Sequence, residues 1–232
     1  SEMTDGTKAI DSRQFYLKLA QRIMHIFTTR TLSGDLYEID TRLRPSGQSG
    51  LLAINIDTFE DYQHSEAWTW EHQALVRGRM VTGDEELTGK FAAIRQGILG
   101  KPRDIHQLKT DIVQMRQKMY DNLSKETPGM FDLKQSRGGI ADIEFIAQFL
   151  VLAHCHRHPE IATYPDNIRI FEQALKLGLL SHGDTEAVIQ AYLAYRSLYH
   201  QASLNSGDKL VVDSEILSYK GTILDLWRRL LL

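Results

Sequence analysis

The pattern of apolar and polar residues predicts a chain built mostly of α-helices. From a cap at Asp11 or Ser12 to about Thr29, apolar side chains recur every three or four residues. The same spacing returns beyond residue 56, where Asp57 and later Asp166 are placed to cap helices. The pattern predicts further helices over residues 57–66, 68–81, 83–99, 104–123, 140–156, 165–180, 182–204 and 214–232.

Residues 36–44 and 50–55 have the alternation of a strand, and a short strand is expected near residues 130–134. In the first segment, alternate residues would share a face. One face is apolar enough for a core, with Tyr37, Ile39, Thr41 and Leu43. The other face is fully charged, with Glu38, Asp40, Arg42 and Arg44.

The charged face has two possible interpretations, a ligand site or a solvated surface. Carboxylates that give way to guanidinium groups match a hard cation with its polyphosphate partner. The alternative is a solvated strand face with ion pairs, which is common on sheets that face water. The segment after it, Pro45-Ser46-Gly47 and then Gly50, supplies a loop whose backbone can approach a ligand closely.

Composition narrows the class of protein. The chain has 232 residues, a net charge of −3 and one cysteine, so it lacks the basic field that nucleic acid binding requires and excludes an internal disulfide. No apolar run is long enough to span a membrane. The polar start without Met is typical of a piece of a longer protein.

Three segments in order resemble the bacterial glutamine synthetase adenylyltransferases. They are LYEIDTRLRPSGQSGLL at 36–52, YQHSEAWTWEHQALVRGRMVTGD at 62–84 and RGGIADIEFIAQFLVL at 137–152. These bifunctional enzymes attach AMP to glutamine synthetase and remove it again. The motifs RLRPSG and EAWTWEHQALVR resemble the AMP-transferring, C-terminal half.

The resemblance implies a predominantly helical α+β fold. A partial nucleotidyltransferase-like α/β unit, residues 1–100, would precede a helical bundle, residues 101–232. It also implies transfer of AMP from ATP with Mg²⁺ to a tyrosine of glutamine synthetase in the bacterial cytoplasm. A PII signalling protein and glutamine are the implied regulatory partners, and neither nucleic acid nor a membrane is expected.

Residue by residue, the resemblance gives Asp40 the role of a metal-binding and catalytic carboxylate. It places the remaining candidates, Glu38, Arg42, Arg44, Arg77, Asp142 and Glu144, around the nucleotide. For Asp142 and Glu144 the alternative is structural, with buried pairing to an arginine such as Arg77, Arg79 or Arg137. Two residues apart, they point in nearly opposite directions on a helix and cannot form one metal site there.

The family pairs the Asp40 carboxylate with an upstream Asp-x-Asp motif, which these 232 residues do not contain. We therefore expect this chain alone to be inactive. Two alternatives stay open: a docking or regulatory module for glutamine synthetase or PII, and the AMP-removing half of the same enzyme.

Overall fold

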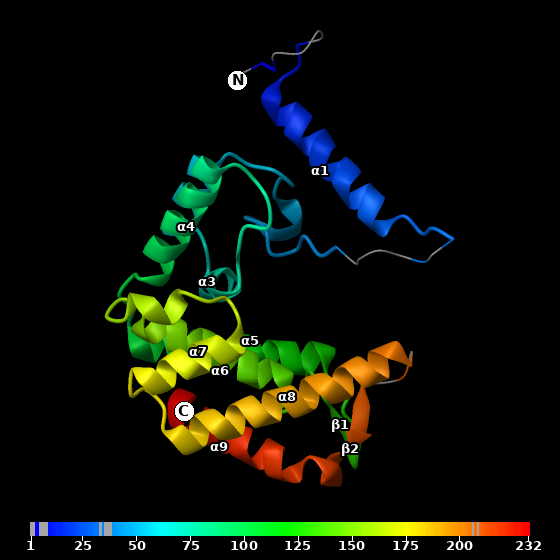
Figure 1. The fold of residues 1–232 in the computed structure, drawn as a ribbon, viewed down its shortest axis with the longest axis vertical. Helices are drawn as coiled ribbons and strands as arrows, with labels where there is room; N and C mark the ends of the chain where they lie inside the picture. Colours follow the sequence, from blue (N-terminus) through cyan, green and yellow to red (C-terminus); the bar gives the residue numbers. More distant parts are fainter. Residues whose placement is uncertain (1–2, 5–8, 33, 35–38, 206, 208) are drawn as a thin grey trace. The chain divides into compact units, whose positions relative to one another are not determined.

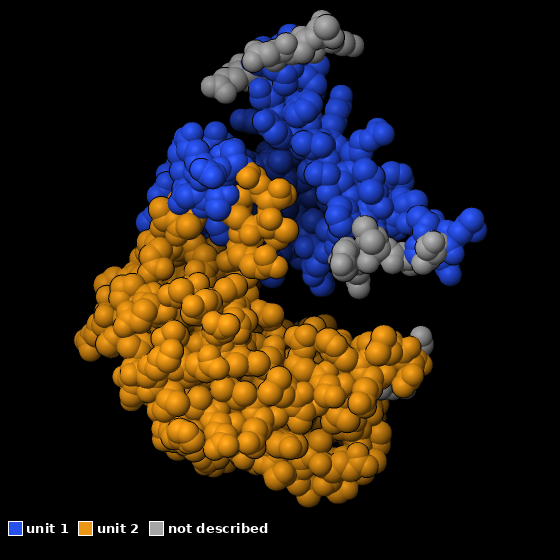
Figure 2. All heavy atoms as spheres, in the orientation of Figure 1, with its two compact units in different colours: residues 1–67, 84–91 blue, residues 68–83, 92–232 orange. Residues whose placement is uncertain are grey.

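The computed structural model describes residues 3–4, 9–32, 34, 39–205, 207 and 209–232. The chain forms two compact units, coloured separately in Figure 2. Unit 1 comprises Ser1–Ala67 and Asp84–Phe91, and unit 2 comprises Trp68–Gly83 and Ala92–Leu232. Each unit is described by itself below.

Unit 1 contains the helices α1 (Ser12–Thr28) and α2 (Ile56–Ser65), the 3₁₀ turn η1 (Gly47–Ser49) and the first turns of α4 (Glu85–Leu99). The expected cap of α1 is confirmed, because the Asp11 carboxylate accepts the N–H of Gln14. Helix α2 begins earlier than expected, since Asn55 caps it in place of Asp57. The apolar stripe of α1 is exposed, with Phe15 at 40% and Ile23 at 45%.

The prediction of strands over 36–44 and 50–55 is wrong for the part of those segments that the structure describes. Residues 42–50 form a succession of turns, and residues 39–41 and 51–55 are irregular. A strand needs a partner for its backbone hydrogen bonds. Here carbonyl groups of this segment are bound by Arg44 of the segment itself. Residues 36–38 lie outside the described part of the chain.

Unit 2 is a helical bundle with a small two-stranded sheet (Figure 1), so the expected predominantly helical α+β class is confirmed. Its α-helices are α3 (Thr69–Val76), the rest of α4, α5 (Ile105–Leu123), α6 (Ile140–His154), α7 (Asn167–Lys176), α8 (His182–Leu204) and α9 (Leu217–Leu231). Short 3₁₀ turns η2 (Pro159–Ala162) and η3 (Asp213–Glu215) precede α7 and α9. Asp104, Asp166 and Ser181 cap α5, α7 and α8 through their side chains.

Helix α6 is the centre of unit 2. It contacts α3, α5, α7, α8 and α9, which lie around it in Figure 1. Ile143, Ile146 and Val151 are fully buried, as a helix that is apolar nearly all round requires. Each such side chain contributes about 1.5–3 kcal/mol when it leaves water.

The small sheet pairs β1 (Met130–Asp132) antiparallel with β2 (Leu210–Val212). The register places Phe131 opposite Val211. The expected strand near residue 130 is thereby confirmed, whereas its partner strand was not predicted. Phe131 is fully buried with its ring 5.7 Å from that of Tyr195, so the sheet is anchored on α8. Among the described residues, no helix combines the length and the apolar character that a membrane span requires.

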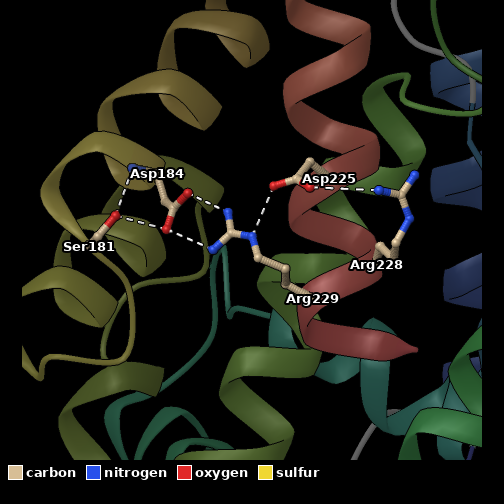
Figure 3. Close-up of polar contacts among 5 residues, drawn as sticks. All are labelled: Ser181, Asp184, Asp225, Arg228 and Arg229. Atoms are coloured by element: carbon tan, nitrogen blue, oxygen red, sulfur yellow. Dashed lines mark hydrogen bonds and ion pairs between the residues drawn. The ribbon is translucent and has the colours of Figure 1, made fainter.

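An ion-pair network joins the start of α8 to the end of α9 (Figure 3). Arg229 donates to both carboxylate oxygens of Asp184, at 2.5 and 3.1 Å, and its Nε donates to Asp225 at 2.9 Å. Ser181, the cap of α8, donates its hydroxyl to Asp184 at 2.8 Å. The hydrogen bonds from Arg229 are the main reason that the pKa of Asp184 lies below the usual value of a carboxyl group.

This network predicts a specific loss of stability in acid. A carboxyl group with a lowered pKa in the folded state stabilises the fold above its unfolded pKa of about 4, and this contribution disappears as the pH falls through the folded pKa. Asp184→Asn should lower the free energy of unfolding by about 1 kcal/mol at pH 7, because the pair is partly exposed. The difference from the wild type should vanish in acid.

Urea unfolding between pH 7 and pH 3, followed by circular dichroism, measures this difference. Glu186→Gln is the control, because Glu186 is an exposed acid on the same helix with a side chain 59% accessible. A pH-independent difference between Asp184→Asn and the wild type would contradict the assignment.

Candidate functional site

The candidate site residues lie in two places, one in each unit. In unit 1 they are in the segment 39–50, which we call the Asp40 loop. In unit 2 they surround the first turns of α6. Glu38, the remaining candidate, lies outside the described residues.

In the Asp40 loop, Asp40 and Arg42 form a close ion pair. The Arg42 guanidinium donates from Nη2 to Oδ2 of Asp40 at 2.6 Å and from Nε to both oxygens at 2.9 and 3.0 Å. The backbone N–H of Arg42 adds a bond of 2.9 Å to Oδ1. These bonds lower the pKa of Asp40 to about 2, although half of its side chain is exposed. Asp40 is therefore ionised throughout the neutral range, as a cation ligand must be, but both oxygens are already engaged.

Arg44 holds the loop closed. Its guanidinium donates to the backbone oxygens of Thr41, Gln48 and Gly50 at 2.7, 2.9 and 2.9 Å. An arginine fork that binds three carbonyl groups at once fixes the path of the backbone. In this structure Arg44 thus acts as a staple within its own loop.

The glycine and proline residues of the loop serve the same turn. Ser46 and Gly47 both have positive φ, at 60° and 56°. At Gly50, an added Cβ would lie 1.9 Å from the carbonyl oxygen of Pro45, which no side chain tolerates. Gly50 is therefore required by the close approach of two backbone segments.

In unit 2, Asp142 is buried near the start of α6 and pairs with Arg116 of α5, which is also buried. Arg116 Nε donates to Asp142 Oδ1 at 2.5 Å, and the N–H of Gly138 donates to Oδ2 at 2.6 Å. Arg116 Nη2 donates further to the carbonyl oxygens of Gln135 and Ser136. Burial raises the pKa of Asp142, while Arg116 and the Gly138 N–H oppose this shift by stabilising the carboxylate.

The arginine partner of Asp142 was not among those expected from the sequence. Arg137, one of the expected partners, donates to Gln117 and lies over the ring of Tyr120. A signal for Arg116 was present, because it continues the buried stripe of Leu108 and Ile112 at a spacing of four residues. A charged residue on a buried stripe requires a buried partner of opposite charge.

Glu144 points to the other side of α6 and pairs with Arg77, the residue after α3. Arg77 Nη1 lies 2.5 Å from Glu144 Oε1, and the two side chains are 42% and 20% exposed. Asp142 and Glu144 thus serve different neighbours, in agreement with their opposite directions on the helix. The Arg77–Glu144 pair reaches the surface, whereas the Arg116–Asp142 pair does not.

Two tryptophans border a cavity of about 370 Å³ between the start of α3 and α5. Trp68 is 70% exposed, and its backbone N–H donates to the Glu71 carboxylate at 2.9 Å. Asp111 of α5 accepts the Thr69 hydroxyl at 2.6 Å, which fixes the start of α3 against α5. The lining residues are Trp68, Thr69, Trp70, Gln107, Asp111, Gln114, Met115 and Lys118. Exposed indole beside amide groups is suited to a flat ring such as a nucleobase.

The described residues contain no cluster of three or more His, Cys, Asp or Glu side chains that would hold a metal ion. Asp40 offers one carboxylate. Mg²⁺ in phosphate-transferring sites uses one or two carboxylates together with water and substrate phosphates. Asp40 therefore fits as one ligand of such an ion and does not make a site by itself.

Comparison with known proteins shows which family the chain resembles. A family model described as "Glutamate-ammonia ligase adenylyltransferase" matches residues 1–94, and one described as "GlnD PII-uridylyltransferase" matches residues 106–210. A Vibrio parahaemolyticus protein named bifunctional glutamine synthetase adenylyltransferase/adenylyl-removing enzyme is 50% identical over 226 residues, which are 97% of this chain. The chain belongs to this family.

Other members of the family match over similar lengths. The protein of the same name from Shewanella loihica is 54% identical over 204 residues, or 88% of this chain, and the one from Mannheimia haemolytica is 49% identical over 231 residues, or all of it. The matched region is 24% of the Vibrio and Mannheimia proteins and 21% of the Shewanella protein. The chain thus spans about a quarter of the length of these adenylyltransferases.

The structure explains why two glycines stand side by side in the family segment at residues 137–152. Gly138 has φ of 83°, and a Cβ there would lie 3.0 Å from the carbonyl oxygen of Lys220 in α9. A Cβ on Gly139 would lie 2.9 Å from the carbonyl oxygen of Ser136. The two glycines let the chain turn tightly into α6, so that the Gly138 N–H reaches Asp142.

The buried pair predicts a large loss of stability when one partner is removed. Arg116→Met should lower the free energy of unfolding by about 3–5 kcal/mol, because it leaves the Asp142 carboxylate buried without its counter-charge. Arg116→Met combined with Asp142→Asn should recover part of this loss, since no unpaired charge remains. Chemical denaturation measures both effects.

Lys118→Met is the matched control, because Lys118 is an exposed cation on the same helix. It should change the free energy of unfolding by less than about 0.5 kcal/mol. If Arg116→Met is as stable as Lys118→Met, the pair does not anchor α6.

Proposed function

We propose that this chain is part of an enzyme that transfers AMP from ATP to a tyrosine of glutamine synthetase, and that Asp40 is a catalytic carboxylate of that site. The observation that supports this most directly is the adenylyltransferase family match over residues 1–94, which contains the whole Asp40 loop. The names of relatives that match nearly the whole chain support it further. These relatives are bacterial, and the proposal includes a location in the bacterial cytoplasm.

In this proposal the Asp40 loop contributes one wall of the ATP site, within a nucleotidyltransferase-like unit that other parts of a longer protein complete. Asp40 would supply one carboxylate ligand to Mg²⁺. When bound, Mg²⁺ would offset the charge of the triphosphate and of the leaving pyrophosphate. Arg42 would leave Asp40 and bind phosphate oxygens, for which a guanidinium fork is well suited.

The other candidate residues take supporting roles in the proposal. Arg44 keeps the loop in shape through its backbone contacts. The ion pair of Arg77 and Glu144 reaches the surface, and the family resemblance makes both residues candidates for contact with the nucleotide. Asp142 is a positioning residue, because it holds α6 and touches Arg116 and Gly138 within the fold.

We propose that the chain has two functional parts. Residues 1–100 would serve nucleotidyl transfer, and residues 101–232 would form a helical bundle. The two family matches, to residues 1–94 and 106–210, fall on either side of this boundary. The compact units divide elsewhere, at residue 67 and again around residues 84–91.

A second candidate function is regulatory docking by the helical bundle. The match of residues 106–210 to a PII-uridylyltransferase model favours a bundle that responds to PII or glutamine, or that receives glutamine synthetase. Pull-down of this chain with PII and with glutamine synthetase separates docking from a purely catalytic role. An assay for release of AMP from modified glutamine synthetase tests whether the chain belongs to the AMP-removing half.

The first prediction of the proposal concerns Asp40. In a full-length family member that carries this segment, Asp40→Asn should reduce kcat for AMP transfer by about 100-fold or more, because even residues that only support metal ligands contribute 10–100-fold. Asp61→Asn is the control, an exposed acid on α2 in the same unit. Incorporation of labelled AMP into glutamine synthetase measures the effect, and near-normal transfer by Asp40→Asn would exclude the metal role.

The second prediction concerns the chain alone. It should bind Mg·ATP far more weakly than the full-length protein, because Asp40 is a single carboxylate whose oxygens are held by Arg42. Isothermal titration calorimetry of both proteins under the same conditions tests this. Tight, Mg²⁺-dependent binding by the 232-residue chain would show that the site is complete without further segments.

A further inference from the structure

We propose that unit 2 has a second binding site, for the phosphate group of a small molecule, in a cavity lined by three lysines. The cavity has a volume of about 310 Å³, at the small end of ligand sites in proteins. It lies beside the two-stranded sheet. Its lining residues are Leu123, Lys125, Asp132, Lys134, Gln135, Tyr199, Gly207, Lys209 and Leu210.

The three lysines come from different segments and are held in place by hydrogen bonds to β1 and its flanks. The Asp132 carboxylate accepts the backbone N–H of Lys125 at 3.1 Å and that of Lys134 at 2.9 Å. The carbonyl oxygen of Lys209 accepts the N–H of Leu133 at 3.0 Å. The fold therefore fixes the backbone of all three lysines around one cavity.

Within the described part of the chain, none of these three ammonium groups forms a salt bridge with a carboxylate. Lys209 Nζ lies over the ring of Tyr199, 5.0 Å from its centre. Asp132, the acid of the lining, has its oxygens bound by the N–H groups of Lys125, Lys134 and Gln135. Three lysines and one aspartate leave the lining with a net positive charge, which attracts an anion.

Gln135 adds an uncharged group to this wall. Its side chain is buried, with 8% exposure, and its Oε1 has no hydrogen-bond partner in the structure as described. A buried amide oxygen without a donor is unusual in a folded protein. A donor, such as a hydroxyl of the organic group of the ligand or a water molecule, would satisfy it.

The chemistry of the lining favours phosphate over carboxylate. Several lysines, each a point charge, suit an anion that carries more than one negative charge, as a phosphate group does and a single carboxylate does not. Leu123, Leu210 and the ring of Tyr199 provide an apolar wall for an organic group attached to the phosphate. A phosphorylated metabolite fits both features, and inorganic phosphate fits the first.

The site is separate from the proposed AMP transfer, because its residues belong to unit 2 alone and none of them is a candidate for that reaction. Its test is binding, so that failure of one proposal leaves the other unaffected.

Calorimetry of the 232-residue chain at physiological ionic strength tests the site with inorganic phosphate, ribose 5-phosphate and ribose. Both phosphates should bind saturably and ribose should not. Tighter binding of ribose 5-phosphate would identify a phosphate ester as the ligand class, and equal binding would identify the phosphate group alone. Lys134→Gln and Lys209→Gln should each weaken binding roughly tenfold, as expected for the loss of one charged hydrogen bond.

Lys176→Gln is the matched control, because Lys176 is an exposed lysine on α7 outside the cavity. Its binding should equal that of the wild type. Thermal unfolding gives a second readout: phosphate should raise the Tm of the wild type and of Lys176→Gln more than that of Lys134→Gln. Absence of saturable phosphate binding, or an equal loss in Lys176→Gln, would overturn the proposal.

Discussion

The contact between Arg116 and Asp142 is the interaction on which the arrangement of unit 2 depends. Both side chains are almost completely withdrawn from water, where neither charge is stable alone. Arg116 also binds the carbonyl oxygens of Gln135 and Ser136, so one guanidinium holds the loop before α6 together with the helix itself. Helix α6 then occupies the centre against which the other helices of the unit pack.

The two carboxylates of α6 tie the helix to two different neighbours. Asp142 connects it to α5 through the interior, and Glu144 connects it to the end of α3 near the surface. The spacing Asp-x-Glu therefore orients the helix about its own axis. Through Arg77, Glu144 also fixes the end of α3 relative to α6.

The sequence predicts local features well and long-range partners poorly. Helix α6 was predictable because its residues are apolar all round, and the caps at Asp11 and Asp166 because the side chain and the N–H that it binds are three residues apart. The prediction of a strand at residues 36–44 was wrong for the described part of that segment. Alternation of apolar and charged residues indicates which residues would share a face, but it does not show that a partner strand exists. The partner of Asp142 was missed for a related reason, because Arg116 is 26 residues away and only folding brings the two together.

The Asp40–Arg42 pair has a consequence for which ligands the loop can accept. A free cation that takes Asp40 breaks its ion pair with Arg42, and a free anion that takes Arg42 breaks the same pair. A ligand that carries both charges at once, such as a metal ion already bound to phosphate, replaces both partners together. The pair would therefore make the binding of metal and phosphate synergistic and would discriminate against either ion alone.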